Sequence, residues 1–416
     1  MPSEPRAFLT QLFQAALRAV DPARIVPAHL PPPPKGRTLV IGAGKASAVM
    51  AKAVEDHWQR PLSGIVITRY GHGSPCRQIE IVEAGHPLPD AAGGDATRRM
   101  PDMLHGLTLD DLVLALISGG GSALLVQPLG PVTLAEKQTV TKALLGSGAD
   151  IGEINCVRKH LSAVKGGRLA RAAAPARLHA LILSDVAGDD LSVVASGPTV
   201  PDPTTQADAL AVLARYRVEV PKSVESVLAD PRLETPKPGA PEFIRVKNEI
   251  VGSGLLALRA AAKMAEAAGV RVIQLGDEIT GEAREVAGKQ AELAKAELGK
   301  GPAIILSGGE TTVTVKGEGH GGRNSEYGLA LAIALRGEPN IWAIACDTDG
   351  IDGNGDNAGV LVTPYTLSRA GARGIDPAEA LARNDSYGFF LQLEDLVRTG
   401  PTRTNVNDFR AIFIAS

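Results

Sequence analysis

Residues 38–55 read TLVIGAGKASAVMAKAVE, which is a short apolar run, a glycine-rich turn and an alanine-rich segment. The same order recurs at LVLALISGGGSALL (112–125) and at EIVGSGLLALRAAAKMAEAAG (249–269). Unbroken apolar strands that alternate with helices are typical of a parallel sheet covered by helices on both faces. The repeated unit therefore predicts an α/β fold.

The chain has 416 residues, which favours two domains over one compact core. A polar, proline-rich stretch, PRLETPKPGAP (231–241), stands between two patterned regions and is interpreted as a linker. A boundary near residue 240 follows. It gives a first domain of residues 1–240 and a second of residues 241–416.

Segments at the two ends of the chain add detail. Apolar residues at three- and four-residue steps predict an amphipathic helix between Phe8 and Val20. AIILSGGETTV (303–313) begins as a strand, and the alternating TTVTVKGEG that overlaps its end suggests a further, antiparallel one. FRAIFIA (409–415) predicts a closing strand. The second half is therefore expected to be mixed α/β.

Composition narrows the class of protein. The net charge of −3 gives no overall basic surface for nucleic acid or anionic lipid. Cys76, Cys156 and Cys346 lack paired spacing, as expected of reduced thiols. The first residues do not resemble a secretory signal, and the longest strongly apolar run, Leu112 to Ile117, is far too short to span a membrane. The cytoplasm is therefore the expected compartment.

The first candidate loop is Gly42-Ala43-Gly44-Lys45-Ala46-Ser47. Ligands of open α/β sheets bind where strands end and helices begin, because helix N-termini expose unpaired N–H groups. As a dinucleotide motif the loop is imperfect, since Ser47 replaces the third glycine and Arg69 stands where an acidic residue is expected. Lys45 supplies a charge for a phosphate or carboxylate, although a tight turn with a solvated lysine is the alternative.

Two further glycine loops predict anion sites. Ser118-Gly119-Gly120-Gly121-Ser122 is costly in chain entropy, which a phosphate cradle or a close helix–strand crossing would explain. Ser307-Gly308-Gly309-Glu310 is followed by a flexible stretch and then by Arg323-Asn324, just before a helical pattern. The Arg323 guanidinium matches phosphate or carboxylate oxygens in a bidentate manner.

Two acidic loops are candidates for a metal–ATP site. Residues 347–357 hold Asp347, Asp349 and Asp352 among glycines, without the spacing of an EF-hand. The second loop holds Asp185, Asp189 and Asp190. Mg²⁺ needs few protein ligands, so one or two of these carboxylates would suffice. A series of Asx turns is the alternative for residues 347–357.

A basic segment, NCVRKHLSAVKGGR (155–168), packs five cationic residues together. If it is helical, Arg158, Ser162 and Lys165 share one face. A solvated surface helix is the commoner explanation of such a run. Arg158 and Lys165 are the candidates for binding an anion.

Several of these segments together closely resemble the type II glycerate kinase family, whose C-terminal part is the MOFRL domain. The resemblance runs from about residue 5 to the end and rests on these segments: GAGKAS (42–47), ISGGGSALL (117–125), NCVRKHLSAVKGGRLA (155–170), LILSDVAGDDLSVVASGPTVPDPTT (181–205), LSGGETTVTVKGEGHGGRNSE (306–326), ACDTDGIDGNGDNAG (345–359), NDSYGFF (384–390) and TNVND (404–408).

The resemblance implies a Rossmann-like N-terminal domain, a smaller α/β MOFRL domain and an active site in the cleft between them. It also implies ATP-dependent phosphorylation of D-glycerate, usually at the 2-hydroxyl. The functionally important lysine and arginine of the family fall on Lys45 and Arg323, the two cations that the loops already single out.

A mechanism is expected from these residues. Phosphoryl transfer mostly needs positioning and charge neutralisation, which are assigned to Lys45 and Arg323. Substrate or nucleotide is expected to bind to the turn Ser118–Ser122 and to Gly44, Arg158, Lys165, Gly308, Gly309, Glu310 and Asn324. Asp189, Asp190, Asp347, Asp349 and Asp352 are the candidates for positioning Mg²⁺, and one of them for orienting the hydroxyl; Asp189 is taken as the catalytic candidate and Asp347, Asp349 and Asp352 as the metal ligands, although the sequence alone does not separate these roles.

Two other functions remain open at this point. An NAD(P)H-dependent hydroxypyruvate reductase would use the Gly42–Gly44 turn for its cofactor, and a non-catalytic regulator would bind a phosphosugar. The number of anion loops weakens the first, and the clustered carboxylates weaken the second. A homodimer would be unsurprising.

Overall fold

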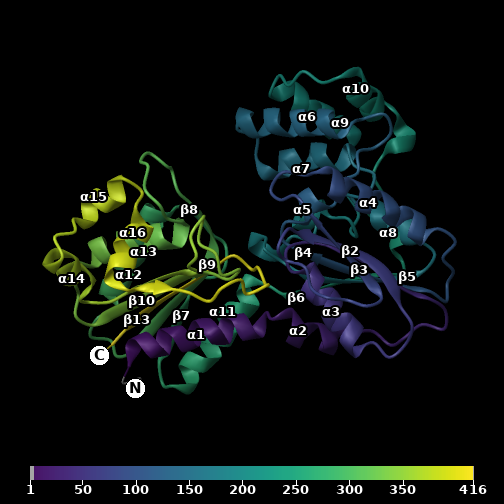
Figure 1. Cartoon of the computed structure of the whole chain (residues 1–416). Helices are drawn as coiled ribbons and strands as arrows, with labels where there is room; N and C mark the ends of the chain where they lie inside the picture. The colour runs from purple at the N-terminus through teal and green to yellow at the C-terminus, as the bar shows by residue number, and fades with distance from the viewer. Residues whose placement is uncertain (1–3, 416) are drawn as a thin grey trace. The chain divides into compact units, whose positions relative to one another are not determined.

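The computed structural model describes residues 4–415, which form two compact units (Figure 1). Unit 1 comprises the residues up to Asp21, the short segment Asp185–Gly188 and the residues from Gly252 onward. Unit 2 comprises Pro22–Ser184 and Asp189–Val251. Each unit has its own sheet.

The sheet of unit 2 has six strands in the order β3-β2-β1-β4-β5-β6. The pairs β1–β2, β1–β4, β2–β3 and β4–β5 are parallel, which confirms the parallel-rich sheet. Every residue of β1 and β4 is buried, because helices cover the sheet. The strands are β1 (Thr38–Ala43), β2 (Ser63–Arg69), β3 (Ile79–Ala84), β4 (Leu112–Ser118), β5 (Arg177–Leu183) and β6 (Val246–Gly252).

Helices of unit 2 fall into two groups. One accompanies the sheet: α2 (Pro22–Ile25), α3 (Ser47–His57), α4 (Ala91–Leu104), α5 (Gly121–Leu124) and α8 (Arg168–Ala173). The other packs around its own apolar cluster: α6 (Leu134–Ser147), α7 (Ile151–His160), α9 (Gln206–Arg215) and α10 (Lys222–Ala229). Capping boxes at Thr133, Asp150 and Thr205 start three of these helices by satisfying their free N–H groups. Short 3₁₀ turns lie at Val26–His29, Ala187–Asp189, Val194–Ser196, Pro231–Leu233 and Pro241–Phe243.

The sheet of unit 1 is mixed, as expected, with the order β12-β11-β10-β13-β9-β7 and β8 paired to β9. β13 is antiparallel to both β10 and β9, whereas β7 and β8 are parallel to β9. The strands are β7 (Arg271–Gln274), β8 (Ile279–Glu282), β9 (Ala303–Thr312), β10 (Ile341–Asp347), β11 (Gly359–Val362), β12 (Leu396–Val397) and β13 (Asp408–Ile414).

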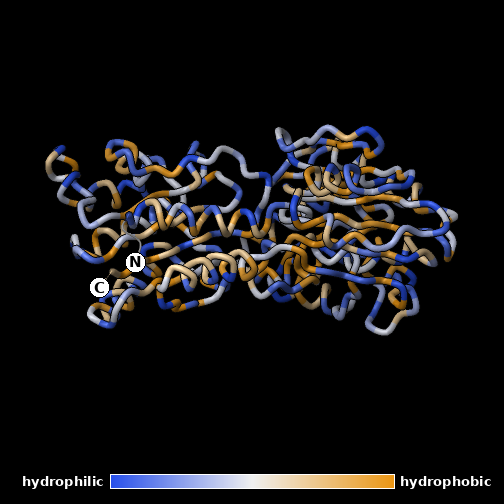
Figure 2. Tube along the Cα trace, turned by 90° about the horizontal axis from the view of Figure 1, so that it is seen from below, coloured by the Kyte–Doolittle hydropathy of each residue, from blue (hydrophilic) through white to orange (hydrophobic). Residues whose placement is uncertain are grey.

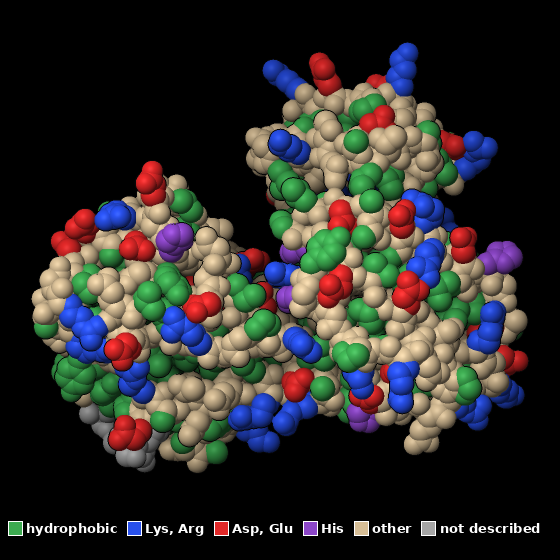
Figure 3. All heavy atoms as spheres, viewed as in Figure 1, with side chains coloured by type: hydrophobic (Ala, Val, Ile, Leu, Met, Phe, Trp, Pro, Cys, Tyr) green, Lys and Arg blue, Asp and Glu red, His purple; other side chains and the backbone are tan. Residues whose placement is uncertain are grey.

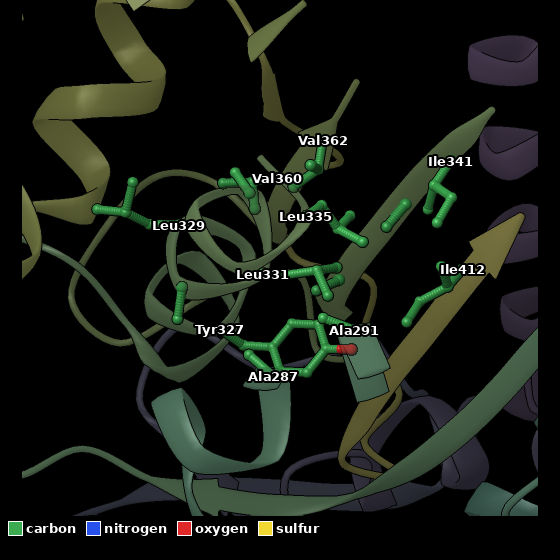
Figure 4. Close-up of a cluster of buried hydrophobic side chains, with 14 of the residues drawn as sticks. Ala287, Ala291, Tyr327, Leu329, Leu331, Leu335, Ile341, Val360, Val362 and Ile412 are labelled. Atoms are coloured by element: carbon green, nitrogen blue, oxygen red, sulfur yellow. The ribbon is translucent and has the colours of Figure 1, made fainter. Parts of the chain in front are cut away.

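Helices cover both faces of this second sheet (Figure 1). The opening helix α1 (Pro5–Ala19) and α11 (Gly254–Ala267) cover one face, where Phe8 packs edge-on against Phe413 of β13 and Phe13 packs at a tilt against Phe409. The other face is covered by α12 (Ala283–Ala296) and α13 (Arg323–Leu335). Tyr327 and Leu331 of α13 lie there in a buried cluster with residues of α12 and of the sheet (Figure 4). The remaining helices are α14 (Thr366–Ala372), α15 (Pro377–Ala382) and α16 (Ser386–Leu393).

Hydrophobic residues concentrate along the inner strands and helices of each unit, and hydrophilic residues along the outer loops (Figure 2). On the face that Figure 3 shows, lysine and arginine side chains are interspersed with acidic ones. Among residues 4–415, no helix combines the length and apolar character that a membrane crossing requires.

The division of the chain differs from the predicted one in two respects. The first residues, including α1, belong to the same unit as the C-terminal half, because α1 packs on α11, β10 and β13. The stretch 231–241 lies within unit 2, where His160 and Lys237 both bind Glu234. A proline-rich stretch can therefore be an ordered part of a domain when polar contacts fix it. The units divide at residues 251 and 252 rather than near 240.

Two predictions of secondary structure need correction. β9 runs unbroken through Thr312, its end pairing in parallel with β8, and no strand follows between residues 313 and 322. The basic segment is helical only to His160, where α7 ends. Ser162 and Lys165 therefore do not share a helix face with Arg158.

Candidate active site

The first group of candidate residues lies in unit 2, at the carboxyl ends of β1 and β4. These strands are parallel neighbours with Ala43 opposite Ile117, so the turns that follow them lie side by side. The Lys45 N–H donates to the Gly119 carbonyl at 2.8 Å, and the Ala46 N–H to Ser118 Oγ at 3.0 Å. One backbone hydrogen bond and one to the Ser118 side chain thus hold the two predicted anion loops together.

Glycine is required at position 44 of this pair of turns. Its φ is +147°, and a Cβ atom there would lie 2.1 Å from Ser118 Oγ and 2.5 Å from the Ser118 carbonyl oxygen. No side chain fits into that gap. Gly44 therefore has a packing role, in addition to any approach of an anion to the backbone.

Gly44→Ala is expected to separate the two turns and to move Lys45. We expect a loss of stability of about 2 kcal/mol or more, because both a backbone strain and a clash arise. Denaturant unfolding of the variant measures it. Gly71 also has a positive φ, but a Cβ added there would have no atom within 4 Å, so Gly71→Ala, with strain alone, is the matched control and should cost less. Equal losses at both positions would show that the contact with Ser118 is unimportant.

Ser122, which follows the triple-glycine turn, belongs to a network of polar contacts that the sequence analysis predicted only in part. Ser122 Oγ contacts Ser196 Oγ at 2.9 Å, and Ser196 Oγ donates to Asn155 Oδ1 at 3.1 Å. Ala195 and Ser196 both have a positive φ, which is uncommon for residues other than glycine and often marks functional sites. The unusual Ala195-Ser196-Gly197-Pro198 stretch is visible in the sequence, but its backbone conformation is not.

The helix after Gly119-Gly120-Gly121 is much shorter than expected, since α5 contains only four residues. Part of the reason for the glycines is packing: a Cβ at Gly121 would lie 2.7 Å from the Ala195 Cβ. Gly120 has a φ of +81° and lines a pocket with Ser122, Arg158 and Lys165. Of the predicted anion-binding residues of unit 2, these four lie around one pocket, although not on one helix; Gly44, Lys45, Ser118, Gly119 and Gly121 do not line it.

Asp189 and Asp190 differ in their surroundings. Asp190 Oδ1 accepts the Ser192 N–H at 2.8 Å, as in an Asx turn. Asp189 has a φ of +56°, and its Oδ1 is buried without a hydrogen-bond donor among the described residues. A buried carboxylate oxygen without a donor is suited to a ligand hydroxyl or a cation.

The second group of candidate residues lies in unit 1 around Arg323, the first residue of α13. Strands β9, β13 and β10 bring Gly309, Asp408 and Asp347 into one row, since Asp408 pairs with both of the others. The Arg323 guanidinium donates from its three nitrogens to Asp408 Oδ1 at 2.8 Å, Asp347 Oδ2 at 2.8 Å and Glu310 Oε1 at 2.5 Å. Burial lowers the pKa of Arg323, but these carboxylates outweigh it and raise that pKa above its ordinary value.

Asp408 and Arg410 were not predicted as site residues. Asp408 accepts from Arg323 and from Asn324 Nδ2 on one oxygen and pairs with Arg410 on the other. Arg410 is fully buried and lies over the ring of Tyr327, 5.3 Å from its centroid. The sequence signals were the TNVND segment, which ends in Asp408, and the presence of Asp and Arg at the start of an apolar closing strand.

The aspartates of the acidic loop after β10 have different roles. Asp352 accepts the N–H groups of Asn324 and Ser325 and the Ser325 hydroxyl, so it holds the first turn of α13 in place. Asp347 is bound by Arg323 and by the Asp349 N–H. Burial and the nearby Asp349 raise the pKa of Asp347 well above its usual range, although Arg323 opposes them.

Within residues 4–415, no group of three His, Cys, Asp or Glu side chains is arranged to hold a metal ion by itself. Asp352 does not suit a metal, because both of its oxygens are occupied by α13. Asp347 also has a donor on each oxygen, Arg323 on one and the Asp349 N–H on the other, but burial and the nearby Asp349 raise its pKa, and a cation between the two carboxylates would relieve that repulsion.

Gly308 and Gly309 have a structural explanation. A Cβ at Gly309 would lie 2.3 Å from the Ile279 carbonyl oxygen, and one at Gly308 would lie 3.1 Å from that of Asp408. These glycines let β8 and β13 approach β9 closely. Glu310 is the exposed member of this loop and reaches Arg323.

Comparisons with known proteins match both the N-terminal and the C-terminal part of the chain. A family model described as a domain of unknown function (DUF4147) matches residues 8–229, and the MOFRL family model matches residues 303–408. A Thermotoga maritima protein named D-glycerate 2-kinase is 41% identical, over 98% of this chain and 98% of its own length.

A crystal structure described as glycerate kinase from Thermotoga maritima superimposes with a TM-score of 0.93 over 100% of both chains, at 41% identity. A protein of Agrobacterium vitis whose name describes a hydroxypyruvate reductase is 53% identical, over 98% of this chain and 94% of its own. The two matched family models, the near-complete coverage and the shared fold lead to one conclusion: the chain belongs to the glycerate kinase family with a C-terminal MOFRL domain.

Proposed function

We propose that this protein transfers the γ-phosphoryl group of ATP to the 2-hydroxyl of D-glycerate, giving 2-phosphoglycerate and ADP. The observation that carries the proposal is the 41% identity, over nearly the whole chain, to a protein named D-glycerate 2-kinase. Each of the two groups of residues described above contains a cation: Lys45, whose backbone is bonded to Gly119, and Arg323, whose guanidinium is held by three carboxylates.

Charge neutralisation is assigned to Lys45 and Arg323. In phosphoryl transfer the charge spreads over the oxygens of the transferred group, so cations placed there stabilise the transition state. Lys45 follows the end of β1, and its backbone is tied to Gly119. Arg323 is oriented by Asp408 and Asp347. We propose that each of these cations neutralises phosphate charge during the transfer.

We propose that Asp347 and Asp349 would hold Mg²⁺, which would supply positive charge to neutralise the phosphates. Asp189 is proposed to accept the hydrogen bond of the glycerate 2-hydroxyl through its buried Oδ1, which would orient that oxygen for attack. The turn Gly119–Ser122 with Arg158 and Lys165 is proposed to bind the nucleotide.

The reductase alternative is disfavoured by the β1 turn. Ser47, where a dinucleotide motif has its third glycine, is buried and donates to the Leu116 carbonyl at 3.0 Å. Arg69, at the end of β2, replaces the acidic residue that would bind a ribose. All three cysteines are free, which is consistent with the cytoplasm as the proposed compartment.

Two parallel assays distinguish the functions. With ATP, Mg²⁺ and D-glycerate we expect ADP release that depends on all three, and with hydroxypyruvate and NADH or NADPH but no ATP we expect no loss of absorbance at the nicotinamide band. Reduction of hydroxypyruvate without ADP release would overturn the proposal. Addition of a chelator is expected to stop ADP release and excess Mg²⁺ to restore it.

A further inference from the structure

A pocket of about 780 Å³ in unit 2 has a composition that the sequence did not predict. Its floor is formed by Gly120 and Ser122 of the turn after β4. Its cations are Lys137 of α6, Arg158 of α7 and Lys165 of the following loop, with Lys142 also among the lining residues. No Asp or Glu lines it among the described residues.

Lys137 is the unusual member of this cluster. Its side chain is only 6% exposed, and its Nζ has no hydrogen-bond partner among residues 4–415. Burial, together with the charges of Arg158 and Arg168, lowers the pKa of Lys137 to about 7. A buried amine without an acceptor costs stability, so an anionic ligand is the natural partner for it.

Burial also affects the two neighbouring basic residues, Lys165 and Arg158. Lys165 Nζ donates to the Ser122 carbonyl at 2.9 Å, and its pKa is well below its ordinary value because of burial and of Lys137 and Arg158. Burial alone lowers the pKa of half-buried Arg158, with no carboxylate among the described residues acting on it. Three cations thus face one space, and no acidic residue of the described chain neutralises them.

The other walls of the pocket are apolar. Leu134 and Leu145 of α6, Val126 and the segment Pro87-Leu88-Pro89 line it. Leu88 is 76% exposed and Leu145 is 58% exposed, both large values for leucine. Exposed apolar side chains around a pocket often mark a ligand site.

Size and composition together identify the class of ligand. A three-carbon acid would leave most of this volume empty and has no apolar surface to place against the leucines. A nucleoside triphosphate has a flat base for the apolar walls and a polyanionic tail for the cations. Gly120, which lines the pocket, lies close to Lys45, since a Cβ at Gly120 would lie 3.3 Å from Lys45 Cγ.

We propose that this pocket seats the nucleoside triphosphate, with its base against Leu134 and Leu145 and its phosphates on Lys137, Arg158 and Lys165. The inference rests on the proposed function for the identity of the nucleotide. It adds a binding residue, Lys137, and a location for the base.

Lys137→Met tests the phosphate end. Loss of a charge-assisted contact is expected to weaken ADP and tripolyphosphate binding by roughly 10- to 100-fold in titration calorimetry. The KM for ATP should rise by a similar factor and the KM for D-glycerate should stay within twofold. Without ligand the melting temperature should rise by a few degrees, because an unpaired buried amine is removed. A purely structural lysine would instead lower it.

Two other variants complete the design. Leu145→Ser replaces an exposed wall residue, so folding should be unaffected; ADP binding should weaken several-fold while tripolyphosphate binding is unchanged. Lys222→Met, at the exposed start of α10, removes the same charge away from the pocket and should alter neither.

Unchanged ADP affinity in Lys137→Met and Leu145→Ser would overturn the inference, as would a raised KM for D-glycerate alone. Failure of the proposed function looks different. In that case the wild-type protein would release no ADP with D-glycerate, yet its binding of ADP and tripolyphosphate would still depend on Lys137.

Discussion

Arg323→Ala is expected to lower kcat for phosphorylation of D-glycerate by roughly 10³-fold or more, the range found for arginines that neutralise a transferred phosphoryl group. Its guanidinium is held by three carboxylates and starts α13, so its position is fixed before substrate arrives. Steady-state kinetics with saturating ATP and glycerate measures the change. Arg323→Lys should be intermediate, because an ammonium keeps the charge but cannot satisfy three carboxylates in one plane.

The control for this experiment is Arg373→Ala, which removes an exposed arginine at the end of α14. It should leave kcat unchanged. Near-ultraviolet circular dichroism confirms that Arg323→Ala is folded. A folded Arg323→Ala protein with kcat within tenfold of wild type would remove Arg323 from the proposed chemistry.

Asp408→Asn is expected to lower the free energy of unfolding by about 3–5 kcal/mol, because the substitution leaves a buried arginine without its charge partner. Asp408 lies between Arg323 and Arg410, and both it and Arg410 are fully buried. Urea unfolding measures the loss. The double variant Asp408→Asn/Arg410→Met should recover much of it, since the unpaired charge is then gone.

The matched control is Asp356→Asn, which breaks an exposed pair with Arg398 and should leave the unfolding midpoint nearly unchanged. If Asp408→Asn behaved like this control, the buried ion-pair network would contribute little to the stability of unit 1. If the double variant were less stable than either single variant, the pairing of Asp408 with Arg410 would not be the cause.

Local sequence patterns were sufficient for much of the fold. The unbroken apolar runs at β1 and β4 predicted buried parallel strands, and both are buried at every position. Arg323 was expected just before a helix and is the first residue of α13. Strands and helix starts depend on neighbouring residues, so a single sequence can indicate them.

Features that depend on distant segments were not predictable in the same way. The opening helix α1 packs with the C-terminal half because Phe8 and Phe13 meet β13, whose residues lie at the other end of the chain. Asp408 reaches Arg323 only through the antiparallel pairing of β13 with β9 and β10. No periodicity in the sequence records such pairings.

The surroundings of some polar residues were also not predictable from the sequence. Lys137 follows a capping box in a helix with no marked apolar face, where a lysine would ordinarily be solvated. Its burial results from α7 and the loop that carries Lys165, which surround the pocket. Asp352 is a similar case. It was expected to bind a metal, but it accepts hydrogen bonds from backbone N–H groups at the start of α13.

The central claim is the transfer of a phosphoryl group from ATP to the 2-hydroxyl of D-glycerate. Phosphorus NMR of the protein incubated with ATP, Mg²⁺ and D-glycerate tests it most directly, because 2- and 3-phosphoglycerate give separate resonances. The account predicts the resonance of 2-phosphoglycerate, growing as that of the ATP γ-phosphate declines. Formation of 3-phosphoglycerate would contradict the assigned hydroxyl, and the absence of any phosphoglycerate would contradict the proposed function.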